Sequence, residues 1–125
     1  MLTVASTTLP PSASSVPAAR RLVHSVSAHL PRRAQEAAEL VASELATNSV
    51  IHAGTSFEVF AAADDDTVEV LVADRAGWAK STTSNSGTGH GLLLVGLLAS
   101  EWAAQIDGPG KHVWARVCVD DVPAW

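Results

Sequence analysis

Apolar residues recur at helical spacing in the first half of the chain. One stripe runs along residues 16–30 and consists of Val16, Ala19, Val23, Val26 and Leu30. This spacing predicts an amphipathic helix. Ser14 or Ser15 can cap the helix, and Pro17 falls in its first turn, where proline is tolerated. Pro31 then ends it.

A second stretch, residues 37–55, predicts another amphipathic helix that ends at a glycine. Its apolar residues recur close to every 3.6 positions, at Ala37, Leu40, Val41, Leu45 and Ile51. Gly54 follows the last of them, and a left-handed helix end is least costly at glycine. We expect the rest of the chain to be organised around this helix.

After the second helix the pattern changes from helical spacing to alternation. Residues 57–61 and 68–72 alternate and predict two strands. Asp64, Asp65 and Asp66 lie between them and favour a turn, so we expect an antiparallel hairpin. Near the C-terminus, residues 102–106 and 113–119 predict two more strands, separated by an Asp-Gly-Pro-Gly turn.

Residues 76–90 lie between these two pairs of strands and have almost no apolar periodicity. They are rich in Gly, Ser, Thr and Asn, and a loop of this length suits a functional lid. The apolar run 92–99 follows and predicts a third helix. A glycine-rich loop leading into a helix N-terminus offers backbone N–H groups to an anion. An ordinary flexible connection has the same pattern.

These elements predict a two-layer α+β sandwich, in which helices cover one face of a mixed, mostly antiparallel sheet. A chain of 125 residues is long enough for one domain. We assign residues 16–119 to that domain and residues 120–125 to a loose tail. Residues 1–15, rich in Ser, Thr and Pro, are expected to form a flexible N-terminal segment, although Leu2 and Val4 can extend an edge strand.

Composition and charge exclude several classes of protein. The 47% of hydrophobic and 17% of charged residues indicate a globular chain. A net charge of −5 argues against direct nucleic-acid or membrane-surface binding, because both need a basic surface. Without a signal peptide or a long apolar run, we expect a cytoplasmic protein. The single cysteine, Cys118, is expected to be a thiol packed on a strand. The sequence has no CxxC pair, the pattern that would indicate a zinc site.

Three polar residues of the second helix are candidates for chemistry. Glu44, Asn48 and His52 are spaced four apart, so they lie along one stripe of a helix. A carboxylate, a carboxamide and an imidazole in one column can hold a divalent cation and a reacting water. The same spacing is also that of a solvated polar face.

Four motifs together resemble a known superfamily. The run ELATNSVIH, from Glu44 to His52, resembles the N-box of the DNA gyrase, heat-shock chaperone, histidine kinase and MutL ATPases, which share the Bergerat ATP-binding fold. The strand ending in Asp74, the run GTGHGLLLV and the final strand KHVWA resemble, more narrowly, the small bacterial anti-sigma-factor serine kinases. The resemblance covers about residues 16–119.

The resemblance implies that the chain binds ATP and Mg²⁺. Asn48 would offer its side-chain oxygen to Mg²⁺, and Asp74 would accept a hydrogen bond from the adenine amino group. Glu44 would be the general base for the attacking hydroxyl. The lid and the start of the next helix would bring backbone amides to the phosphates, and the remaining positions implied to bind ATP are Gly77, Gly87, Gly89, His90, Gly91 and Leu92.

The resemblance also implies a function and partners. The chain would be a regulatory serine/threonine-protein kinase that acts on transcription by binding a sigma factor and phosphorylating a serine of an anti-anti-sigma protein. Such kinases often form homodimers. Arg20 and Arg21 on the first helix are a candidate protein-binding face, or else solvated side chains.

The chain departs from the family pattern near the adenine-binding aspartate. Ala76 and Trp78 stand where the family motif DxGxG has glycines, and Lys111-His112 stands where a threonine is often found. An alternative is therefore a degenerate Bergerat-fold interaction module that binds ATP weakly or not at all. A plain ATP hydrolase and the catalytic half of a split histidine kinase are further alternatives.

Overall fold

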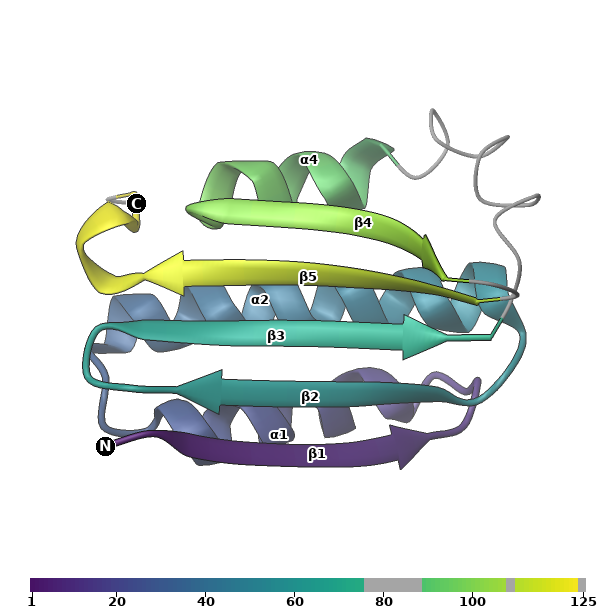
Figure 1. Cartoon of the computed structure of the whole chain (residues 1–125), viewed down its shortest axis with the longest axis horizontal. Coiled ribbons are helices and arrows are strands. Elements are labelled where there is room, and N and C mark those ends of the chain that lie inside the picture. The colour runs from purple at the N-terminus through teal and green to yellow at the C-terminus, as the bar shows by residue number, and fades with distance from the viewer. Residues whose placement is uncertain (76–88, 108–109, 124–125) are drawn as a thin grey trace.

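The structure, a computed structural model, describes residues 1–75, 89–107 and 110–123. Figure 1 shows a sheet with helices packed behind it. The elements in chain order are β1 (Thr3–Leu9), α1 (Ser15–Ser27), α2 (Arg32–Asn48), the π-helical turn η1 (Ser49–Ala53), β2 (Phe57–Ala63), β3 (Thr67–Asp74), α4 (Gly89–Leu98), β4 (Glu101–Asp107), β5 (Gly110–Cys118) and the 3₁₀ turn η2 (Val119–Asp121).

The described strands form one sheet in the order β1-β2-β3-β5-β4, and each neighbouring pair is antiparallel. Helices α1 and α2 lie against one face of this sheet, while α4 packs against α2 and β4. This arrangement confirms the predicted α+β sandwich. None of the helices within the described residues is long and apolar enough to cross a membrane.

The core lies between the sheet and the helices. Alternate residues of β3 and β5 point toward the helices and are buried, namely Val68, Val70, Val72, Val113, Ala115 and Val117. They face buried alanines of α2, among them Ala34, Ala38, Ala42 and Ala46. Fully burying a valine contributes about 1.5–3 kcal/mol relative to exposing it, so these alternating positions hold the sheet against α2.

The N-terminal residues differ from the predicted flexible segment, because residues 3–9 form the edge strand β1. The strand pairs with β2 from Thr3 opposite Ala63 to Leu9 opposite Phe57. Ala5 and Leu9 are half-buried and pack against the core. The strand gains its stability from this pairing, which a Ser/Thr-rich sequence with few apolar side chains does not reveal.

The C-terminal residues, predicted to form a loose tail from residue 120, begin with an ordered turn. Residues 119–121 form η2, and the Val122 side chain, 8% exposed, belongs to the core cluster. Residues 124–125 lie outside the described part of the chain. The Cys118 side chain is half-buried on β5, as expected of a packed thiol.

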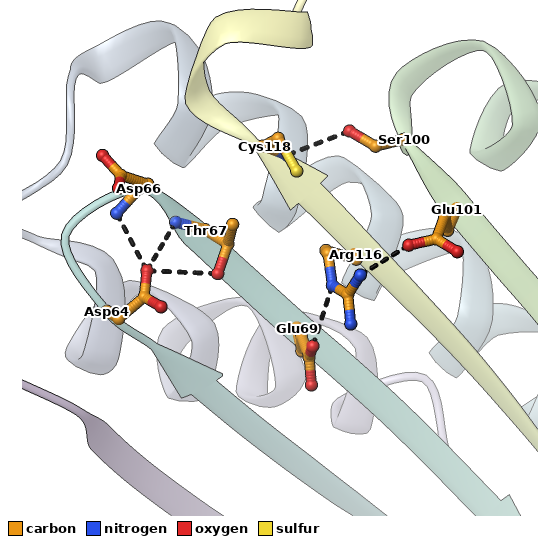
Figure 2. Close-up of polar contacts among 8 residues, drawn as sticks. All are labelled: Asp64, Asp66, Thr67, Glu69, Ser100, Glu101, Arg116 and Cys118. Atoms are coloured by element: carbon orange, nitrogen blue, oxygen red, sulfur yellow. Dashed lines mark hydrogen bonds and ion pairs between the residues drawn. The ribbon is translucent and has the colours of Figure 1, made fainter.

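The Asp64 carboxylate stabilises the turn between β2 and β3. The three consecutive aspartates had predicted a turn at this place. Its Oδ1 accepts hydrogen bonds from the backbone N–H of Asp66 (2.8 Å), the backbone N–H of Thr67 (2.8 Å) and the Thr67 hydroxyl (3.1 Å), as Figure 2 shows. The bond from the Asp66 N–H, followed by that from the Thr67 N–H, lowers the pKa of Asp64 below its ordinary value.

Stability is therefore expected to depend on the charge of Asp64. Because its pKa is lower in the folded than in the unfolded chain, the carboxylate stabilises the fold above the unfolded pKa, and this contribution is lost as the pH falls through the folded pKa. Asp64→Ala should lower the thermal midpoint at neutral pH and lower it less in acid. Asp65→Ala removes a neighbouring carboxylate that accepts none of these bonds, so an equal loss in both variants would contradict the assignment.

Candidate functional site

Four segments that are distant in the sequence meet at one end of the molecule. The C-terminal ends of α2 and β3 and the N-terminal ends of α4 and β5 all lie at the right-hand end in Figure 1. Packing between α2 and α4, and between η1 and β3, joins these segments. The residues predicted to bind ATP belong to these segments or to the loop that precedes α4.

The polar column predicted on the second helix runs from α2 into the turn that follows it. Glu44 and Asn48 lie one turn apart in α2, and both side chains are half-buried. The helix continues after Asn48 as the turn η1, whose backbone hydrogen bonds span five residues. His52, the third residue of the predicted column, lies in this wider turn and is half-buried. The turn ends at Gly54, whose φ of 68° is left-handed as predicted.

The Glu44 carboxylate and the Asn48 amide have no polar partner in the described part of the chain. Within the described residues, neither side chain makes a hydrogen bond or an ion pair. A half-buried carboxylate and a half-buried amide oxygen on one helical stripe can accept a proton and contact a cation, respectively.

Asp74 lies at the C-terminal end of β3, and its side chain is 6% exposed. It occupies the sheet face that points toward the helices, next to Phe57 of β2. From the helix layer, the hydroxyl of Ser49 donates a hydrogen bond to Oδ2 of Asp74 (3.3 Å). Ser49 is the residue directly after Asn48, so one short segment of chain connects the predicted metal-binding residue to the predicted adenine-binding residue.

Lys111 faces Asp74 from the other side. The two residues are opposite each other in the β3–β5 register, and Lys111 is 8% exposed. Burial lowers the pKa of the Lys111 ammonium group, while the negative charge of Asp74 opposes that shift. The adenine-binding position of the family pattern is thus bordered by a cation in this chain.

Gly110 lets β5 approach the end of β3 closely. A Cβ atom at this position would lie 2.2 Å from the carbonyl oxygen of Asp74 and 3.3 Å from the Cα of Arg75. Both of these are backbone atoms, which cannot move without shifting the strand. Only glycine therefore fits here.

We expect Gly110→Ala to destabilise the fold by about 1–3 kcal/mol, the usual range for overpacking, because β5 must move away from Asp74. Urea denaturation measures this change. Gly96→Ala in α4 is the matched control: its Cβ would lie 3.5 Å from Nε1 of Trp102, which is an ordinary contact, and alanine is the better helix former. Equal unfolding midpoints for the two variants would contradict the close approach.

The other predicted ATP-binding positions are only partly described. Gly89, His90, Gly91 and Leu92 form the first residues of α4, so a helix N-terminus begins where a phosphate site was predicted. Gly77 and Gly87 lie outside the described residues, as do Ala76, Trp78 and the other lid residues up to 88.

The described residues fit Mg²⁺ bound together with phosphates better than a metal held by protein alone. Among them, no three His, Cys, Asp or Glu side chains gather into a metal site. Mg²⁺ commonly uses one or two side-chain oxygens and completes its shell with phosphate oxygens and waters. The Asn48 amide oxygen is a donor of that kind.

Ser49 was not among the predicted site residues, and Lys111 was noted only as a departure from the family pattern. Ser49 follows the N-box run directly, but only the fold brings its hydroxyl to Asp74. The contact of Lys111 with the site follows from the strand register. Alternation shows which residues of a strand share a face, and pairing across strands then determines which residue of β5 meets Asp74.

Two comparisons with known proteins bear on this arrangement. A sequence model of the histidine kinase-like ATPase domain matches residues 9–117. The chain is also similar to the crystal structure of the RsbU and RsbW domains of Rv1364c from Mycobacterium tuberculosis, with a TM-score of 0.73 and 20% sequence identity. That match covers 92% of this chain but 32% of the other, and at this identity it shows a shared fold. A comparison with curated protein sequences found no match.

The family match includes every element from α1 to β5. The resemblance of the N-box run and the three later motifs to the Bergerat-fold superfamily is thereby confirmed. The chain belongs to the histidine kinase-like ATPase domain family.

Proposed function

We propose that this protein is an ATP-dependent serine/threonine-protein kinase of the anti-sigma-factor type. It would phosphorylate a serine of an anti-anti-sigma protein and bind a sigma factor. The observation that carries this proposal is the pair of half-buried side chains Glu44 and Asn48 on one stripe of α2, connected through Ser49 to the buried Asp74. Family membership and the fold shared with a chain that contains an RsbW domain support it.

Each side chain would have one role. Asp74 would bind the adenine amino group, and Ser49 would hold the carboxylate in position. Asn48 would hold Mg²⁺, which when bound supplies positive charge against the phosphate oxygens. Glu44 would accept the proton of the attacking serine hydroxyl. Phosphoryl transfer depends mainly on positioning and on charge stabilisation, so this small set of side chains suffices.

Calorimetric titration with Mg-ATP tests the proposal. The wild-type protein should bind, and Asn48→Ala should weaken binding by roughly tenfold or more in the presence of Mg²⁺. Without Mg²⁺ the two proteins should bind ATP alike, because the amide is proposed to act through the metal. Thr47→Ala, a half-buried neighbour on the same helix, is the control. No binding by the wild-type protein would overturn the proposal.

The departures from the family pattern support a second candidate, an interaction module with weak or no ATP binding. Ala76 and Trp78 replace glycines of the adenine motif, and Lys111 lies beside Asp74. The same titration separates the candidates. Tight Mg-ATP binding excludes the module, whereas capture of a sigma factor or an anti-anti-sigma protein by a chain that binds no ATP would favour it.

A further inference from the structure

The sheet carries a buried cation at the position where adenine is proposed to bind. Lys111 and Asp74 are paired across β3 and β5, and both side chains are on the face that points toward the helices. They are 8% and 6% exposed, respectively. Burying an ammonium group carries a large desolvation cost. The burial of Lys111 beside Asp74 therefore needs a structural or functional reason.

The surroundings of Asp74 orient its carboxylate. Ser49 donates to Oδ2 from the helix layer, Phe57 packs beside it on β2, and Lys111 stands beside it on β5. A hydrogen-bond acceptor and a hydrogen-bond donor therefore lie next to each other in one row of the sheet. The long, flexible stem of lysine lets its donor adjust to a ligand.

We propose that Lys111 is a second adenine-recognition residue, which donates a hydrogen bond to the ring nitrogen N1 while Asp74 accepts one from the N6 amino group. This inference rests on the proposed binding of ATP. On adenine, the N6 donor and the N1 acceptor are neighbours on one edge of the ring, so a carboxylate beside an ammonium group is complementary to that edge. Hydrogen bonds from a charged donor are the stronger ones.

An analogue of ATP separates this role from a merely structural one. If Lys111 only neutralised Asp74, its loss would affect every adenine nucleotide alike. In 1-deazaadenosine triphosphate, a C–H group replaces N1 and the N6 amino group is kept. A contact between Lys111 and N1 is lost with this analogue, whereas a contact between Lys111 and Asp74 is unchanged.

The experiment is a calorimetric titration of the full chain with the magnesium complexes of ATP and of 1-deazaadenosine triphosphate. The wild-type protein should bind ATP roughly tenfold or more tightly than the analogue. In Lys111→Met the two affinities should become equal. Arg116→Met is the control, because Arg116 is a cation of the same strand on the opposite face, paired with Glu69 and Glu101 (Figure 2). This variant should keep the wild-type ratio.

Equal affinities of the wild-type protein for the two nucleotides, or an unchanged ratio in Lys111→Met, would overturn the inference while leaving the proposed function intact. If the wild-type protein binds neither nucleotide, the proposed function fails and the inference fails with it. Thermal denaturation checks that Lys111→Met is folded. If it is not, Lys111→Gln keeps a neutral donor and should give a ratio between one and the wild-type value. A wild-type ratio in Lys111→Gln would also count against the contact.

Discussion

Glu44→Gln should reduce phosphoryl transfer to the anti-anti-sigma protein by about 10²–10⁴-fold, the usual contribution of a general base. Glutamine has nearly the same shape as glutamate and cannot accept the proton. Binding of Mg-ATP should stay close to that of the wild-type protein, because Glu44 is proposed to act on the attacking hydroxyl rather than on the nucleotide. Transfer of labelled phosphate from ATP to the partner, measured in single turnovers, gives the rate of the chemical step.

Glu36→Gln is the matched control for this experiment. Glu36 lies on α2, two turns before Glu44, and is exposed. Its loss should leave transfer unchanged. If Glu44→Gln transfers phosphate at the wild-type rate, Glu44 is not the base. If both variants lose transfer, the effect comes from the charge of the helix.

Asp74→Asn should weaken ATP binding by roughly 10–150-fold, which corresponds to losing a hydrogen bond to a charged group. The amide can turn its NH₂ group toward the adenine amino group and then offers no acceptor there. The Ser49 hydroxyl and the Lys111 ammonium group also lose a charged partner, so the variant should be less stable than the wild type. Titration with ATP should therefore be done well below the thermal midpoint of the variant.

Purine riboside triphosphate, which lacks the N6 amino group, distinguishes recognition from destabilisation. The wild-type protein should bind this analogue as weakly as Asp74→Asn binds ATP, and the variant should bind both nucleotides alike. Asp65→Asn, in the turn at the other end of β3, is the control and should bind ATP as the wild type does. Wild-type affinity of Asp74→Asn for ATP would remove Asp74 from the adenine site.

Local patterns predicted the elements whose own side chains determine their conformation. The amphipathic spacing and the glycine at 54 indicated α2 and its left-handed end, since both signals lie within the helix itself. The β2–β3 hairpin followed from two alternating runs around three aspartates, and the structure explains the turn by hydrogen bonds to Asp64. The motif that begins at Glu44 indicated the ATPase superfamily, and the match to the histidine kinase-like ATPase domain confirms it.

Features that depend on distant pairing had a weak signal in the sequence or none. The strand β1 has few apolar residues and exists through its ladder with β2. The widening of the helix at Ser49–Ala53 also carries no sequence signal. The position of Lys111 beside Asp74 needed the register of two strands that are not consecutive in the chain.

The pairing of β3 with β5 has a consequence for how the chain folds. Asp74 and Lys111 meet only after α4 and β4, which lie between them in the chain, have been accommodated. Contacts of such long sequence separation are slow to form, because a large loop must close first. A nascent or clipped chain that lacks β5 also lacks the pairing of Asp74 with Lys111, which we propose binds adenine. A nucleotide that binds only the finished pocket would then favour complete chains over truncated ones and protect them from proteolysis.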